Sequence, residues 1–156
     1  MLSTRSSWVP LPLRIGIGTI MTIHGLGKLG VGPLASPDGV AGFAGFLASL
    51  GVPLALVTAW FVTLVELVGG VLLLVGLFVR YAAVFIAGDM VVATLLVHLP
   101  NGFAVSDGGY EFTLLLALAS VSLVLSGPGV LSLERALLGG EYVPLSSSGT
   151  TEEGTA

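Results

Sequence analysis

The sequence contains no cysteine and few charged residues. Of its 156 residues only 9% are Asp, Glu, Lys or Arg, against about 25% in typical soluble domains. The absence of cysteine excludes disulfide bonds, thiolate metal sites and cysteine-ligated iron–sulfur clusters. The five cations are scattered along the chain rather than clustered, so we expect no binding to nucleic acid.

Hydrophobic residues instead make up 54% of the chain. A soluble domain of this length has too much surface for its volume to bury so large an apolar area. A lipid bilayer removes the difficulty, because hydrocarbon tails then surround the apolar exterior. The composition therefore predicts an integral membrane protein whose main partner is the lipid bilayer.

Four apolar segments are long enough, or nearly long enough, to cross a bilayer, which takes a helix of about 20 residues. They span residues 11–28, 53–79, 81–99 and 110–126. Their long apolar runs show no two-residue alternation, which favours helices over strands. We expect an all-α protein, a transmembrane four-helix bundle that occupies residues 1–139.

The connections between these segments also carry structural signals. The first connection begins with glycine and proline, but Val40, Phe43 and Leu47 then follow at helical spacing, which predicts a short amphipathic helix between the first two spans. The second and third spans leave room only for a tight hairpin, which we expect to have Arg80 at its tip. Residues 140–156 are rich in Ser, Thr, Gly and Glu, and we expect a disordered acidic tail there.

The cations predict how the bundle is oriented. With four crossings, both termini lie on one side together with Arg5, Arg14, Arg80 and Arg135, and only Lys28 lies on the other. Cytoplasmic segments carry the excess of Lys and Arg, so we expect a multi-pass protein of the plasma membrane with both termini in the cytoplasm. The glycine-rich faces of the first two spans would also permit a homo-oligomer.

Ionisable side chains within the spans mark the candidate functional positions. Each costs at least ~2.5 kcal/mol at the centre of a bilayer on insertion scales. A rise of about 1.5 Å per residue places His24, Lys28, His98 and Glu111 in the outer half of the bundle and Glu66 near the midplane. We expect these residues to line a polar ligand-binding pocket that opens outward.

Each of these residues also has a structural explanation. Lys28 could extend to lipid headgroups, His98 could bond to backbone at a helix end, and Glu111 could cap a helix. Glu66 is harder to explain in this way, because apolar residues flank it and only a cation from another span could pair with it. Lys28 and His24 are the nearest candidates for that cation.

Three further charges are expected to be structural. Asp89 lies nine residues before His98, which is about half a turn out of phase on an α-helix, so we expect that the two do not share a pocket. Asp89 is more simply explained by an inward pair with Arg80 or Arg14. Such a pair would fix the arrangement of the helices rather than bind a ligand.

The sequence contains no motif for a cofactor. Gly25 and Gly27 lack the third glycine and the preceding strand of a dinucleotide fingerprint, and no metal signature is present. His24 and His98 belong to different spans at similar depth and could in principle be axial ligands of a haem. No second histidine pair supports that alternative, so we disfavour haem and expect no metal.

The order of these features is similar to that of a known family. The series contains Arg14, His24-Gly25-x-x-Lys28, Leu50-Gly51-Val52-Pro53, Glu66-x-x-Gly69-Gly70, Arg80, His98, Asn101-Gly102-Phe103, Gly109-x-Glu111 and Gly127-Pro128-Gly129. From Arg14 to Arg135 the chain resembles the DoxX family of small four-span membrane proteins. The resemblance implies that the recurrent charged positions of the family match Arg14, His24, Lys28, Glu66, Arg80, His98 and Glu111.

The resemblance also implies a class of function. The family takes its name from a subunit of a thiosulfate:quinone oxidoreductase, and other members are associated with membrane oxidoreductase complexes. It therefore implies a quinone-associated redox subunit that works with a partner subunit, and it leaves open whether this chain is itself an enzyme. The alternative is a non-enzymatic scaffold, assembly factor or small-molecule carrier.

Overall fold

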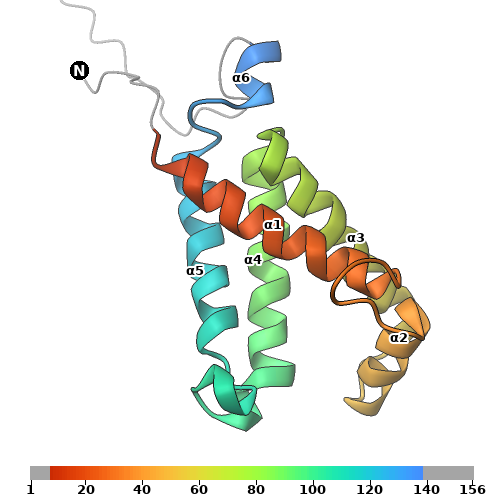
Figure 1. Cartoon of the computed structure of the whole chain (residues 1–156). Helices are drawn as coiled ribbons and strands as arrows, with labels where there is room; N and C mark the ends of the chain where they lie inside the picture. The colour runs from red at the N-terminus through yellow and green to blue at the C-terminus, as the bar shows by residue number, and fades with distance from the viewer. Residues whose placement is uncertain (1–7, 139–156) are drawn as a thin grey trace, which may run out of the picture.

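The computed structural model describes residues 8–138, which form helices joined by turns and contain no strand (Figure 1). The main helices are α1 (Pro10–Lys28), α2 (Gly39–Ser49), α3 (Ala55–Val75), α4 (Val79–Ala93), α5 (Glu111–Ser126) and α6 (Leu133–Leu138). α4 continues as a π-helical turn, η1 (Thr94–His98), and a 3₁₀ turn, η2 (Leu99–Asn101), and a further 3₁₀ turn, η3 (Val105–Asp107), precedes α5. The all-α prediction is confirmed for this part of the chain, and the predicted tail lies outside it.

Within residues 8–138, two helices are long and apolar enough to cross a membrane. They are Ala55–Val75 and the continuous helical stretch Val79–Asn101. α5 has 16 residues, which is about 24 Å at 1.5 Å per residue and shorter than a hydrocarbon core of about 30 Å. The predicted second and third spans therefore have the required length and composition, and the first and fourth stay predictions.

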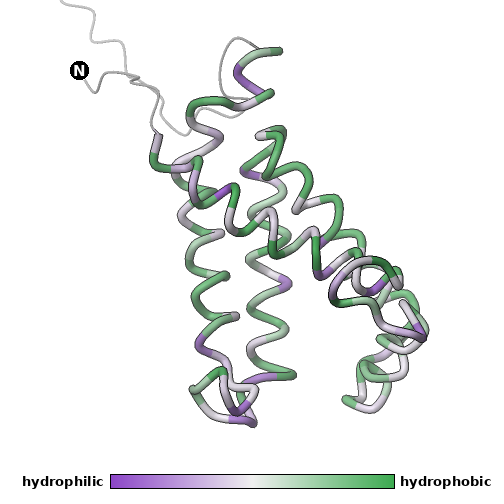
Figure 2. Tube along the Cα trace, in the orientation of Figure 1, coloured by the Kyte–Doolittle hydropathy of each residue, from purple (hydrophilic) through white to green (hydrophobic). Residues whose placement is uncertain are grey.

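The outer surface of these helices suits lipid rather than water. Figure 2 shows hydrophobic positions along most of α3, α4 and α5, with isolated hydrophilic positions between them. Large apolar side chains on this surface are at least half exposed, including Leu56, Phe61, Val84 and Leu115. So much exposed apolar area is unusual for a soluble monomer and expected for a protein surrounded by hydrocarbon.

The helices are arranged around a V-shaped pair. α3 and α4 meet at a tight turn and diverge from it (Figure 1). α5 packs beside α4, α2 packs on the far end of α3, and α1 crosses over α3 and also contacts α5. Apolar side chains of α1, α3, α4 and α5 form the main core, including Ile17, Met21, Leu73, Ile86, Leu116 and Leu123.

The hairpin between α3 and α4 differs in position from the prediction. Its tip is Gly76–Phe78, because Gly76 adopts a φ of 71° and ends α3. This left-handed conformation favours glycine, and a Cβ at Gly76 would also overlap the guanidinium of Arg14. Arg80, predicted at the tip, lies instead in the first turn of α4 and donates hydrogen bonds to two backbone carbonyls near the end of α5.

Glycines bring α1 and α3 into close contact. A Cβ on Gly25 would lie 2.7 Å from the backbone nitrogen of Leu67, and one on Gly70 would lie 2.6 Å from that of Thr22. Such distances leave no room for a side chain. Small residues allow this approach in lipid, where helix association depends on van der Waals contact. The short separation lets side chains at the end of α1 reach the middle of α3.

Candidate functional site

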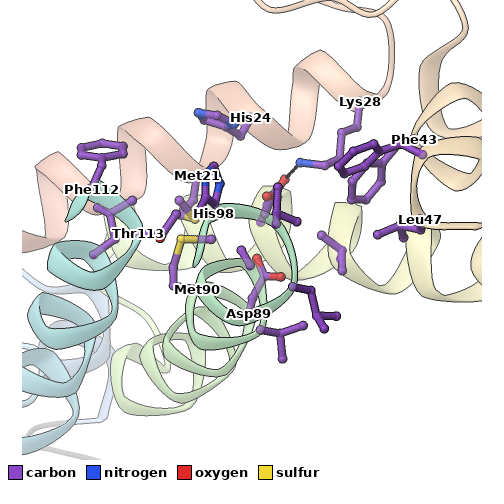
Figure 3. Close-up of a pocket in the computed structure, with 18 of the residues that line it drawn as sticks. Met21, His24, Lys28, Phe43, Leu47, Asp89, Met90, His98, Phe112 and Thr113 are labelled. Atoms are coloured by element: carbon purple, nitrogen blue, oxygen red, sulfur yellow. Dashed lines mark hydrogen bonds and ion pairs between the residues drawn. The ribbon is translucent and has the colours of Figure 1, made fainter. Parts of the chain in front are cut away.

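A cavity of ≈ 400 Å³ lies on the open side of the V (Figure 3). α1 contributes His24 and Lys28, α3 contributes Glu66, and α4 with its π-helical extension contributes Asp89 and His98. Most of the remaining wall is apolar and includes Met21, Phe43, Leu47, Met90, Phe112 and Leu116. The structure therefore brings together four of the five residues predicted to form a pocket.

An ion pair between Lys28 and Glu66 spans the interface of α1 and α3 at the cavity. Nζ of Lys28 donates a hydrogen bond to Oε2 of Glu66, and only 16% and 6% of the two side chains are exposed. The ammonium group also lies 4.8 Å from the ring centre of Phe43 on α2, a cation–π contact. The prediction that a cation from another helix pairs with Glu66 is confirmed. Lys28 supplies it because the glycine contacts bring the end of α1 close to α3.

Asp89 lines the same cavity, so the prediction that it pairs with Arg80 or Arg14 is wrong. Both arginines donate to backbone carbonyls near the opposite end of the bundle. Within residues 8–138, the buried Oδ2 atom of Asp89 has no hydrogen-bond partner. A buried acceptor without a donor costs about 1–3 kcal/mol, which makes this oxygen a candidate for contact with a ligand.

The π-helical turn Thr94–His98 explains why Asp89 and His98 face one cavity. A π-helix bonds each residue to the fifth along rather than the fourth, so it changes the phase of every residue that follows. The prediction that the two side chains lie on opposite faces is wrong because it assumed an uninterrupted α-helix. Hydrophobic periodicity did not reveal this turn.

The ring of His98 is held by the loop that precedes α5. Its Nδ1 atom lies 2.7 Å from the carbonyl oxygen of Gly108. A carbonyl can only accept, so Nδ1 carries a proton and donates it in this hydrogen bond. Nε2 is then the ring nitrogen that remains available to a ligand in the cavity.

His24 lies one helical turn before Lys28 on α1 (Figure 3), and both residues line the cavity. The four-residue spacing predicted that they share a face. The ring of His24 is exposed, and it has no hydrogen-bond partner among the residues that the structure describes. An imidazole in this position is free to exchange protons with water or with a ligand.

Glu111 does not line the cavity, so its predicted place in the pocket is wrong. Its Oε1 atom accepts a hydrogen bond of 2.7 Å from the backbone N–H of Val105 in the loop before α5. This arrangement fits the alternative structural explanation, an acidic residue at a helix start. The prediction used only the position of Glu111 along the bundle axis, which is level with the pocket. The rotation of α5 about its own axis points this side chain toward the loop instead.

Arg14 and Glu134 form a second cluster near the Gly76–Phe78 turn. Arg14 is 1% exposed, and its guanidinium donates five hydrogen bonds of 2.8–3.3 Å to backbone carbonyls. Two of these carbonyls, those of Leu73 and Leu74, belong to the last turn of α3, where carbonyls lack the i+4 donors of the helix interior. Glu134, which the sequence analysis missed, is 2% exposed and accepts a hydrogen bond from the N–H of Val79 at the start of α4. This cluster has a structural role and fixes the position of the turn.

The sequence analysis also missed the part of the cavity wall that α2 contributes. Phe43, Phe46 and Leu47 line the cavity, and the two phenylalanine rings stack with centroids 6.4 Å apart. Their helical spacing predicted an apolar face on α2. It did not indicate what that face covers, because the flanking loops leave the position of α2 open.

Comparisons with known proteins point to one family. The DoxX profile matches residues 9–99, a range that contains His24, Lys28, Glu66, Asp89 and His98. A protein of Bacillus subtilis named "Putative oxidoreductase CatD" is 35% identical over 124 residues, 80% of this chain and 83% of that protein. An "Uncharacterized protein" of Haemophilus influenzae is 32% identical over 127 residues, 79% of this chain and 86% of that protein. No solved structure gives a significant match.

Proposed function

This chain belongs to the DoxX family, and on that basis we propose that it is a quinone-associated redox subunit of a membrane oxidoreductase complex. In this proposal the cavity holds the quinone ring, and a partner subunit exchanges electrons with it. The family, a relative named as an oxidoreductase and the chemistry of the cavity support the proposal.

The observation that carries the proposal is an apolar cavity with titratable groups on its surface. A quinone ring is flat and apolar and has two carbonyl oxygens that accept hydrogen bonds. Side chains such as Met21, Met90 and Phe43 suit the ring, and Lys28 can donate to an oxygen. Reduction to the quinol consumes two electrons and two protons. A carboxylic acid or a protonated imidazole beside the ring, such as that of His98, would supply a proton.

The electrons come from outside this chain in the proposed mechanism. The sequence has no cysteine and no dinucleotide fingerprint, so it offers no motif for an iron–sulfur cluster or a nicotinamide cofactor. The residues of the cavity would bind and orient the ring and exchange its protons. A separate redox subunit would complete the reaction.

We also propose that the chain crosses the plasma membrane four times, with both termini in the cytoplasm. α1 and α5 pack against the two apolar helices α3 and α4, which supports this placement. The absence of native cysteine makes labelling of single introduced cysteines unambiguous. A membrane-impermeant maleimide is expected to label Ser106→Cys in intact cells and Ala136→Cys only after permeabilisation. The opposite pattern would reverse the orientation.

Extraction of the purified protein tests the quinone site. Solvent extraction of wild-type protein is expected to release quinone, and the absorbance spectrum of the same sample reports any haem. Glu66→Gln is expected to retain at least about tenfold less quinone, because it removes the partner that positions Lys28. Glu111→Gln makes the same chemical change outside the cavity and is expected to retain wild-type levels. Wild-type protein that neither carries quinone nor binds added quinone would refute the proposal.

A non-enzymatic scaffold, assembly factor or carrier is the second candidate function. In its favour, Lys28 and Glu66 satisfy each other across the interface of α1 and α3, so a structural use of both charges is chemically complete. A double variant, Glu66→Gln with His24→Asn, separates the candidates. If it folds and quinone turnover in the membrane is unchanged, the redox function fails. Full quinol oxidation by the isolated chain would instead contradict the subunit role.

A further inference from the structure

We propose that the ligand enters sideways from the bilayer and places its hydrocarbon chain in a groove between α3 and α4, with its polar ring in the cavity. This inference rests on the proposed function and specifies its substrate class. The substrate would be an isoprenoid quinone dissolved in lipid, rather than a tailless quinone that arrives from water. The position of the groove beside the cavity carries the inference.

An apolar groove of ≈ 760 Å³ follows the line where α3 and α4 meet. Its wall includes Phe61, Val65 and Val68 of α3 and Tyr81 and Phe85 of α4, and no charged side chain lines it among the described residues. Phe61, Val68 and Phe85 are 56%, 49% and 55% exposed. The groove therefore presents an open apolar surface at a place where lipid surrounds the helices.

Helical spacing places this groove next to the polar cavity. Phe85 of the groove lies one turn before Asp89 of the cavity, on the same face of α4. α3 and α4 diverge from their turn (Figure 1), and the cavity residues of α4 lie farther from that turn than its groove residues. The stretch from Tyr81 to Asp89 covers about 12 Å at 1.5 Å per residue. The groove and the cavity are therefore neighbours along α4, and in this proposal they serve as one path, apolar along its length and polar at one end.

The chemistry of the path favours a single amphiphilic ligand over two separate occupants. A hydrocarbon chain gains little by leaving lipid for an apolar groove, because lipid tails are equally apolar. A chain that is covalently joined to a ring bound beside Asp89 and Lys28 is different, since the attachment keeps it at high local concentration near the groove. The groove then adds van der Waals contacts that a tailless ring does not make.

Two quinones with the same ring test this inference. Menadione is a methylnaphthoquinone without a tail, and the menaquinone with four isoprene units carries the same ring with a chain. The full-length protein in lipid nanodiscs is titrated with each. Val68→Trp fills the groove, and Val84→Trp adds the same side chain to an equally exposed position on α4 that lines neither chamber.

We expect wild-type protein to bind the tailed quinone at least about tenfold more tightly than menadione. Val68→Trp is expected to abolish that preference without changing the affinity for menadione, and Val84→Trp is expected to match wild type. Equal wild-type affinities for the two quinones would overturn the groove but leave the head-group site intact. An equal loss in both tryptophan variants would also overturn it. If neither quinone binds, the proposed function fails as well.

Discussion

The two ends of the molecule both bury charged side chains, but within residues 8–138 it is on the open side that a buried charged side chain with an unpartnered atom lines the cavity. Near the Gly76–Phe78 turn, every N–H of the Arg14 guanidinium donates to a backbone carbonyl. On the open side, Lys28 and Glu66 pair with each other, while Oδ2 of Asp89 has no partner within residues 8–138 and faces a cavity. The comparison teaches that burial of charge alone does not identify a binding site. A buried polar atom that has no hydrogen-bond partner and lines a cavity is a more specific indication of a binding site.

The largest expected effect on stability is at Arg14, near the Gly76–Phe78 turn. Arg14→Met removes five hydrogen bonds and leaves the carbonyls of α3 and of residues 128–131 without these donors. We expect the free energy of unfolding to fall by at least about 3 kcal/mol. Thermal unfolding in detergent, followed by tryptophan fluorescence, measures the change. The cavity is remote from this position, so quinone affinity of the folded fraction is expected to stay unchanged.

Arg80→Met provides the control for this prediction. Arg80 donates hydrogen bonds to two carbonyls of α5, whereas Arg14 donates to carbonyls of α3 and of the segment that follows α5. We therefore expect a smaller loss than for Arg14→Met. Equal losses in the two variants would mean that the α3 and loop contacts of Arg14 contribute nothing specific. The Arg14 cluster would then not be a specific source of stability, and the comparison with the cavity would fail.

An intermediate effect is expected for the ion pair at the cavity. Lys28→Met leaves the carboxylate of Glu66 buried without a cation. We expect a loss of about 2 kcal/mol, below the roughly 3–5 kcal/mol of a fully buried pair, because 16% of the Lys28 side chain is exposed. The double variant Lys28→Met with Glu66→Leu removes both charges, so most of this loss should be recovered. A double-mutant cycle of chemical unfolding measures the coupling. If the double variant is as unstable as the sum of the single variants, the two charges are not coupled as the structure indicates.

The smallest effect on stability is expected at Asp89. Asp89→Asn keeps the shape of the side chain and breaks no hydrogen bond of the buried oxygen, so we expect the free energy of unfolding to change by no more than about 0.5 kcal/mol. Quinone affinity is expected to fall about tenfold, because the group contacts the ligand rather than the protein. Binding in nanodiscs and thermal unfolding are measured on the same preparation. A large loss of stability with normal quinone binding would mean that Asp89 stabilises the fold and does not bind the ligand.

The positions of the helices were largely predictable from the sequence. Long apolar runs, separated by segments that contain glycine and proline, predicted α1, α3, α4 and α5 to within a few residues at most ends. The pairing of Glu66 with a cation from α1 was also predictable, because few charges were available and an unpaired carboxylate is costly in an apolar setting. The errors were local. Arg80 was placed at the hairpin tip, although Gly76 is the residue whose conformation ends the helix.

The errors in the site share one physical cause. Sequence spacing gives the depth of a residue along a helix, but its direction depends on the phase of that helix and on its neighbours. The π-helical turn Thr94–His98 changed the phase between Asp89 and His98, and the phase of α5 directed Glu111 to a loop. Neither event leaves a mark in hydrophobic periodicity. Phe43 was missed as a cavity residue because tertiary contacts with α3 and α1 position α2.

The sequence by itself determined that this chain is helical and apolar, that it has few charged residues, and that those buried in the helices need partners. These properties follow from composition and from the cost of placing ions in an apolar medium. The tertiary structure decided which charged side chains have hydrogen-bond partners and which line the cavity. Glycine contacts placed Lys28 against Glu66, and a π-helical turn let His98 line the same cavity as Asp89. The first outcome depends on the distance between segments far apart in the chain, and the second depends on the hydrogen-bond pattern of one helical turn, which hydrophobic periodicity does not reveal.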